Sequence, residues 1–270
     1  MNFETLATTL ADGIAVIELN RADKANAMNA QMWQDIASAF RWVDETPAAR
    51  VAVIRGSGKT FCAGIDLAML AGLKAQIQSD CEGRTRETLR RQILYLQETL
   101  STIERCRKPV IAAIHGACVG GGIDLITCCD MRYASADAYF SVKEIDVGMA
   151  ADVGTLQRLP KLVPDGIARE LAYTGRRFDA AEAKAIGLVN HVFDSPADLH
   201  AGVAEIAAKI AAKSPLSIRG IKEMIVYARD HSVADGLNYV ATWNAAMLMS
   251  ADLTEAAQAA QERRAPTFRD

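Results

Sequence analysis

Residues 110–124 read VIAAIHGACVGGGID. The five apolar residues 110–114 predict a buried strand, and the three consecutive glycines 120–122 predict a tight turn that leads into a helix. The same order recurs in residues 51–71, where an apolar strand at 51–54 precedes a glycine-containing turn and a helical stretch. Two strand–turn–helix units of this kind predict an α/β fold.

The rest of the chain extends this pattern outward from the two units. We expect a hairpin of strands 3–10 and 13–19, helices at 26–45 and 73–106, short strands at 131–134 and 138–142, and a mostly helical remainder from 155. No low-complexity tract or linker divides the chain before about residue 195, and the last quarter is rich in alanine. We therefore expect a core at 1–195 and a C-terminal helical lobe at 196–270.

Composition limits the classes of partner. The chain has 270 residues, of which 50% are apolar and 23% charged, a globular rather than a disordered composition. Its 30 basic and 33 acidic residues give a net charge of −3. This balance offers no electrostatic reason to expect a nucleic acid or an anionic membrane as the main partner.

The cysteines and the first residues bear on the compartment. Six cysteines are irregularly spaced, without a zinc-type pattern, so we expect reduced thiols, no metal site and a cytoplasmic location. The first twenty residues contain no lysine or arginine, which argues against a secretory signal or a transit peptide. The apolar stretch 109–129 contains four glycines and an aspartate, and we expect a buried strand and helix there rather than a membrane span.

The two glycine turns are candidate sites because each leads into a helix start. The first backbone N–H groups of a helix have no partner within the helix. Two such groups that converge on one point could stabilise a carbonyl oxygen that gains negative charge, as an oxyanion hole does. The alternative is that the glycines only allow close packing, and neither turn has a nucleotide-binding pattern.

Three carboxylates stand in apolar or glycine-rich surroundings, at Asp124, Glu144 and Asp152. They are candidates for proton transfer because burial and neighbouring charges shift the pKa of a carboxyl group. A helix start would lower the pKa of Asp124 and burial would raise it, and sequence alone leaves this open. The alternative is that Asp124 caps a helix and Asp152 caps a turn.

Several motifs resemble the crotonase (enoyl-CoA hydratase/isomerase) superfamily over residues 3–269. They are FCAGIDL at 61–67, IAAIHG at 111–116, the glycines 120–122, RADKANAMN at 21–29, GRRFDA at 175–180 and AIGLV at 185–189. Ala22 stands where that family usually has proline. Within the superfamily, KEIDVGMAADVGTLQRLP at 143–160, RDHSVA at 229–234 and LNYVA at 237–241 resemble the Δ3,5-Δ2,4-dienoyl-CoA isomerases.

The resemblance implies a spiral of repeated ββα units, a C-terminal helical lobe for oligomerisation, and a homotrimer or a dimer of trimers. It implies an acyl-CoA thioester as substrate, bound in the 1–195 core, with coenzyme A as part of the substrate and no separate cofactor. Ile65 and Gly121 would supply the oxyanion-hole N–H groups. The implied substrate-binding residues are Lys24, Ala25, Ala63, Gly64, Ile65, Asp66, Leu67, Gly121 and Gly122.

The implied reaction moves the two double bonds of a 3,5-dienoyl-CoA to positions 2 and 4. Glu144 and Asp152 would exchange protons at C2 and C6, and Asp124 would perturb Glu144. Ordinary hydratases of the family have glutamate where this chain has Asp124 and usually glycine where it has Asp152. An enoyl-CoA hydratase is the first alternative, with Asp124 and Glu144 positioning a water. A non-catalytic acyl-CoA or RNA binder is the second.

Overall fold

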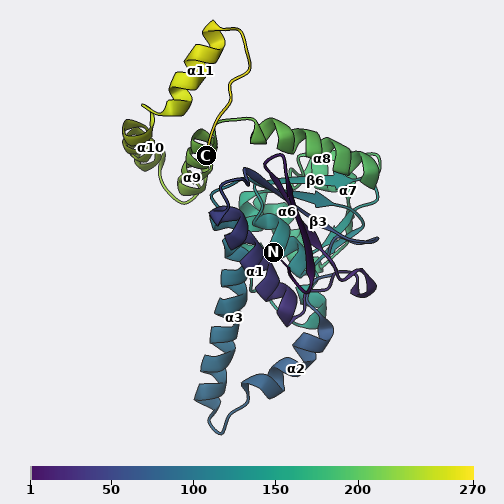
Figure 1. Ribbon diagram of the computed structural model, residues 1–270. Coiled ribbons are helices and arrows are strands. Elements are labelled where there is room, and N and C mark those ends of the chain that lie inside the picture. Colours follow the sequence, from purple (N-terminus) through teal and green to yellow (C-terminus); the bar gives the residue numbers. More distant parts are fainter. Residues whose placement is uncertain (1) are drawn as a thin grey trace.

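The computed structural model describes residues 2–270 and contains two β-sheets surrounded by helices (Figure 1). The main sheet has six strands in the order β1-β2-β3-β4-β6-β9, and the small sheet has three in the order β5-β7-β8. Their bounds are Leu6–Ala11 (β1), Ile14–Leu19 (β2), Val51–Gly56 (β3), Val110–Ile114 (β4), Ala117–Val119 (β5), Met131–Ser135 (β6), Tyr139–Ser141 (β7), Phe178–Asp179 (β8) and His191–Phe193 (β9). The expected α/β class is confirmed.

The helices are placed mainly on the two faces and at one end of the main sheet. Their bounds are Ala30–Glu45 (α1), Leu67–Ile77 (α2), Glu82–Arg105 (α3), Gly121–Thr127 (α4), Thr155–Arg158 (α5), Asp165–Thr174 (α6), Ala180–Ala185 (α7), Pro196–Ala211 (α8), Pro215–Ala228 (α9), Val233–Met247 (α10) and Ala251–Gln261 (α11). Short 3-10 helices span Ala22–Lys24 (η1), Glu144–Val147 (η2) and Leu159–Lys161 (η3). Within residues 2–270, no helix combines the length and apolar character that crossing a membrane requires.

Strand alternation divides the core between the two faces of the main sheet. In β3, Ala52 and Ile54 pack with α1 and α3, whereas Val51 and Val53 pack with α8. In the main sheet, β2, β3, β4, β6 and β9 run parallel, and the β1–β2 hairpin is antiparallel. Burial of both faces explains why the 51–54 and 110–114 strands are uniformly apolar in sequence. Because β3 and β4 run parallel, their carboxyl ends lie at the same end of the main sheet, and the chain continues from there into the two glycine turns.

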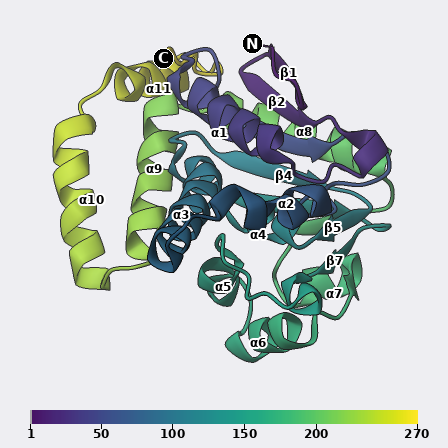
Figure 2. The same cartoon turned by 90° about the horizontal axis from the view of Figure 1, so that it is seen from below.

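The C-terminal helices differ from the expected boundary at residues 195 and 196. Leu199, Val203 and Ala207 place α8 against the main sheet, so α8 belongs to the core in packing. The helices that extend away from the sheet begin at α9 and continue with α10 and α11 (Figures 1 and 2). The sequence pattern missed this because α8 and α9 are both alanine-rich or apolar helices separated by only three residues.

Two further expectations needed correction. The helix expected at 73–106 is two helices, because residues 78–81 form a turn in which the Ser79 backbone N–H donates to Thr85 Oγ1 at 3.0 Å. The segment after residue 155 contains two strands, β8 and β9, which are too short to show a clear period. Five of the six unpaired cysteines are buried, and Cys81, at the start of α3, is exposed.

Candidate active site

The two glycine turns lie side by side. Cys62, in the first turn, pairs with Cys118 of β5: the Cys62 N–H donates to the Ala117 carbonyl at 2.9 Å, and the Val119 N–H donates to the Cys62 carbonyl at 3.0 Å. Gly64 has a φ of +95°, and a Cβ atom there would lie only 2.9 Å from the Val119 carbonyl oxygen. Glycine is therefore required at this position by backbone conformation and by close approach.

The backbone N–H groups of Ile65 and Gly121 are near each other, and among residues 2–270 neither has a hydrogen-bond acceptor. Met28 and Ile65 form a parallel bridge, in which the Met28 N–H donates to the Gly64 carbonyl and the Asp66 N–H donates to the Met28 carbonyl. The Ile65 N–H therefore points away from Met28. Gly121 is the first residue of α4, where a helix N–H has no partner within the helix. A Cβ atom on Gly121 would lie 3.6 Å from the Ile65 nitrogen. Two such donors side by side have the arrangement that an oxyanion hole requires.

Glu144 lies beside this pair of donors. It begins η2, and its Oε1 is 3.2 Å from the position that a Cβ atom on Gly120 would occupy. Its Oε2 is buried and has no hydrogen-bond partner among residues 2–270. Burial, followed by the charges of Asp124 and Asp152, raises the pKa of Glu144 to about 7. Near neutral pH this carboxylate can therefore accept or release a proton.

Asp124 is the most deeply buried of the three carboxylates, with 1% of its surface exposed. Its Oδ1 accepts a hydrogen bond of 2.6 Å from the Thr155 backbone N–H, whereas Oδ2 has no partner in the described chain. Burial raises the pKa of Asp124 to about 6, although the hydrogen bonds from Thr155 act in the opposite direction. Asp124 thus contacts the first residue of α5 rather than capping its own helix, and burial outweighs the effect of the helix start on its pKa.

Asp152 lies three residues before Thr155, the first residue of α5 and the one that Asp124 contacts. Burial raises its pKa, and its charge in turn raises the pKa values of Asp124 and Glu144. The three carboxylates therefore form one electrostatic cluster, in which ionisation of one group opposes ionisation of the others. The structure brings together the three predicted catalytic residues, and their individual roles stay predictions.

The expected substrate-binding residues form a continuous strip from η1 to α2. The Ala63 N–H donates to the Ala25 carbonyl at 3.0 Å, which joins the 21–29 segment to the first glycine turn. Asp66 caps α2 through the Ala68 N–H and forms an ion pair of 3.0 Å with Arg21. Lys24 and Leu67 are exposed at the ends of this strip, and Gly122 packs under it against Cys62.

Sequence reasoning missed two residues that shape the site. Asn26 is fully buried, and its side-chain amide donates to the carbonyls of Ser57 and Thr60 at 2.9 and 2.7 Å, fixing the loop before the first glycine turn. The signal in the sequence was the polar Asn26 among the apolar neighbours Ala25, Ala27 and Met28. Thr155 acts through its backbone N–H, as described for Asp124, and a backbone contact leaves no mark in the sequence.

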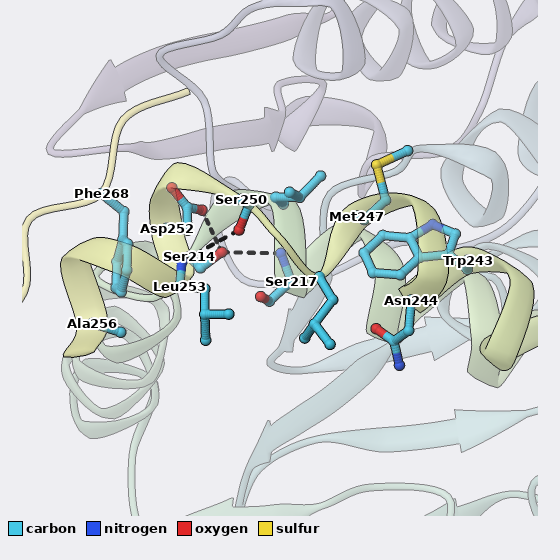
Figure 3. Close-up of a pocket in the computed structure, with 12 residues that line it drawn as sticks. Ser214, Ser217, Trp243, Asn244, Met247, Ser250, Asp252, Leu253, Ala256 and Phe268 are labelled. Carbon is cyan, nitrogen blue, oxygen red and sulfur yellow. Dashed lines mark hydrogen bonds between the residues drawn. The ribbon is translucent and has the colours of Figure 1, made fainter.

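A separate cavity of about 260 Å³ lies among the C-terminal helices (Figure 3). Its walls come from α9, α10, α11 and Phe268, and the Ser214 hydroxyl donates to Asp252 within it. None of the predicted site residues lines this cavity. Its one carboxylate is already hydrogen-bonded, so we place the chemistry at the glycine turns instead.

The parallel sheet with its covering helices and the two adjacent glycine turns define a crotonase-type protein. The sequence profile of the Enoyl-CoA hydratase/isomerase family matches residues 9–270. The chain belongs to this family. It is 49% identical to a peroxisomal Delta(3,5)-Delta(2,4)-dienoyl-CoA isomerase of Arabidopsis thaliana, over 93% of this chain and 90% of that protein.

A human relative and a solved structure give the same family. The mitochondrial Delta(3,5)-Delta(2,4)-dienoyl-CoA isomerase of Homo sapiens is 47% identical over 97% of this chain and 81% of that protein. The crystal structure of an enoyl-CoA hydratase from Bacillus anthracis superposes with a TM-score of 0.89 at 32% identity, covering 98% of this chain and 99% of that one.

Proposed function

We propose that this chain is an enzyme that isomerises 3,5-dienoyl-CoA to 2,4-dienoyl-CoA in the β-oxidation of unsaturated fatty acids. The observation that carries the proposal is the carboxylate cluster of Asp124, Glu144 and Asp152 beside the paired N–H groups. The relatives of 49% and 47% identity, which are named for this reaction, support the isomerase over the hydratase.

In the proposed reaction, Glu144 removes a proton from C2 of the acyl chain. The electron pair of that C–H bond delocalises toward the thioester oxygen, whose negative charge the N–H groups of Ile65 and Gly121 stabilise. The double bonds shift from C3=C4 and C5=C6 to C2=C3 and C4=C5 as Asp152 donates a proton to C6. The raised pKa values of Asp152 and Glu144 suit this exchange, because ionisation of one carboxyl opposes ionisation of its neighbours.

Two substrates distinguish the isomerase from the hydratase. With a 3,5-dienoyl-CoA, we expect the absorbance of the conjugated 2,4-diene to grow without uptake of water. With crotonyl-CoA, we expect little hydration. Rapid hydration of crotonyl-CoA without any diene isomerisation would overturn the proposal in favour of the hydratase.

Substitution of Asp152 tests the second proton transfer in deuterated water. Asp152→Asn keeps the size of the side chain but removes its ability to exchange a proton. We expect this variant to incorporate deuterium at C2 without forming product. Glu144→Gln should show neither exchange nor product. Full turnover by the Asp152 variant would contradict the assigned role.

We also propose that the chain assembles as a homotrimer or a dimer of trimers through its C-terminal helices. Apolar residues of α9 and α10 support this, because Ile225, Val233 and Leu237 are 67%, 79% and 64% exposed in the single chain. A cytoplasmic location and the absence of a nucleic-acid partner or a separate cofactor stay predictions. The plant and human relatives are named as peroxisomal and mitochondrial.

A further inference from the structure

One face of α3 carries three polar side chains, Gln97, Ser101 and Glu104, which we call the α3 polar stripe. Their spacing of four and then three residues places them in a row along the helix. Leu96, Leu100 and Ile103 are buried in the core on the adjoining face. Packing of α3 against the core therefore fixes the direction in which the polar stripe points.

The polar stripe holds both ends of segment 152–158, which runs from Asp152 to the end of α5. Gln97 Nε2 donates to the Asp152 backbone carbonyl at 2.6 Å. At the other end, Arg158 Nη2 donates to Ser101 Oγ at 3.3 Å and lies 3.1 Å from Glu104 Oε2. The Arg158 and Glu104 side chains are only 14% and 16% exposed, so water weakens this ion pair less than a surface pair.

The middle of the same segment, at the first residue of α5, is bound to the candidate active site. The Thr155 N–H donates to Asp124 Oδ1, as described above. Asp152 thus lies on a seven-residue segment, 152–158, that is fixed at both ends by α3 and in the middle by the carboxylate cluster. Glu144, Ile65 and Gly121 lie on other elements, and the described hydrogen bonds connect none of them to the polar stripe.

The C-terminal helices join this network through Arg229, which follows α9. Its guanidinium donates to the second oxygen of Glu104, so one carboxylate binds two arginines. The neighbouring Asp230 pairs with Lys161 of η3. The RDHSVA motif at 229–234, which the proposed reaction leaves without a role, therefore connects the C-terminal helices to the polar stripe.

We propose that the α3 polar stripe is a positioning device that holds Asp152 where it can transfer a proton at the far end of the diene. This inference rests on the proposed function, because it assigns Asp152 to the second proton transfer. Gln97 and Glu104 are positioning residues in this scheme and do not touch the substrate. Loss of either contact displaces Asp152 while the groups that act at C2 stay in place.

Two substitutions in the stripe test the proposal, with one control on the same helix. Gln97→Leu removes the donor to Asp152, and Glu104→Gln removes the charge that holds Arg158 and Arg229. Glu98→Gln is the control, because Glu98 is exposed and pairs with Arg105 on another side of α3. Each variant is incubated with a 3,5-dienoyl-CoA in deuterated water, and product formation and C2 exchange are measured separately.

We expect product formation to fall about tenfold or more in both stripe variants, because small displacements of a reacting group are costly. Deuterium exchange at C2 should stay within about twofold of the wild type, and the control should keep both rates. A parallel fall of exchange and product would show a general structural defect and overturn the proposal. Unchanged product formation in both stripe variants would also overturn it.

A second measurement separates this inference from the proposed function. If the wild type does not isomerise the diene at all, the proposed function fails, and the positioning role is tested by amide hydrogen exchange alone. We expect the amides of residues 152–158 to exchange about tenfold faster in Gln97→Leu than in the wild type, since this segment loses its hydrogen bond from Gln97. Unchanged protection of this segment would overturn the positioning role regardless of substrate.

Discussion

Replacement of Glu144 by glutamine should make the folded protein more stable at alkaline pH while abolishing isomerisation. The structure gives the reason: Glu144 is largely buried beside two other carboxylates, and one of its oxygens has no hydrogen-bond partner within residues 2–270. Its ionised form is therefore costly in the folded state. Glutamine has nearly the same shape and no charge, so it avoids this cost.

The size of the effect follows from the pKa of Glu144, which rises from 4.5 to about 7 on folding. Below pH 4.5 the group is protonated in both states and lowers stability little. Between pH 4.5 and about 7, the unfolded chain has lost the proton that the folded protein retains, so stability falls as the pH rises and levels off above 7. At about 1.4 kcal/mol for each pKa unit, wild type should lose about 3 kcal/mol by pH 8 relative to Glu144→Gln.

Urea unfolding of both proteins at several pH values between 5 and 8, at equal protein concentration, measures this difference. The advantage of Glu144→Gln should increase with pH and level off above 7. Glu98→Gln is a suitable control, because a hydrogen bond from Arg105 lowers the pKa of Glu98 and its removal should give no gain. A stability difference that stayed constant from pH 5 to 8 would refute the argument from burial.

Four other outcomes can be checked. Ile65→Ala should retain most activity, whereas Ile65→Pro, which lacks the N–H donor, should lose about 100-fold or more in kcat; equal rates would remove the oxyanion assignment. Gly64→Ala should lower both kcat and the melting temperature, because its Cβ would clash with the Val119 carbonyl; a normal kcat would contradict this. The kcat/KM for the diene should rise with pH as Glu144, whose pKa is about 7, ionises, and should fall again where Asp152 loses the proton that it donates; a flat profile would argue against this base and acid. Leu237→Glu on α10, which has no buried residue in the single chain, should abolish trimers in sedimentation experiments without unfolding the protein; unchanged sedimentation would exclude α10 from the interface.

The sequence predicted those strands and helices whose pattern of apolar residues matches the faces that are buried in the folded chain. The apolar strands β3 and β4 and the helix α1 show this agreement, because a single face or both faces are buried along their whole length. The break between α2 and α3 and the short strand β9 could not be predicted in the same way. The break depends on side-chain hydrogen bonds within a polar turn, and β9 is stabilised by pairing with β6, a contact between distant residues.

In the candidate site too, some features could be predicted from the sequence and others could not. Motifs with specific side chains identified Asp124, Glu144 and Asp152, and the structure brings them together. The contacts that hold Asp152, by contrast, join Gln97 to a backbone carbonyl and Arg158 to α3 across more than fifty residues. No spacing rule in a single sequence links such pairs, so these contacts became visible only in the folded chain.

The unequal burial of the six cysteines makes the protein suited to site-specific labelling. Cys81 is the one exposed thiol, and it lies in the turn between α2 and α3, at the opposite end of α3 from Glu104. Burial raises the pKa values of the other five thiols, including Cys62 beside the first glycine turn, which leaves them unreactive. A maleimide fluorophore should therefore attach at Cys81 without mutagenesis, and its emission would report how α2 and α3 respond when an acyl chain enters the site.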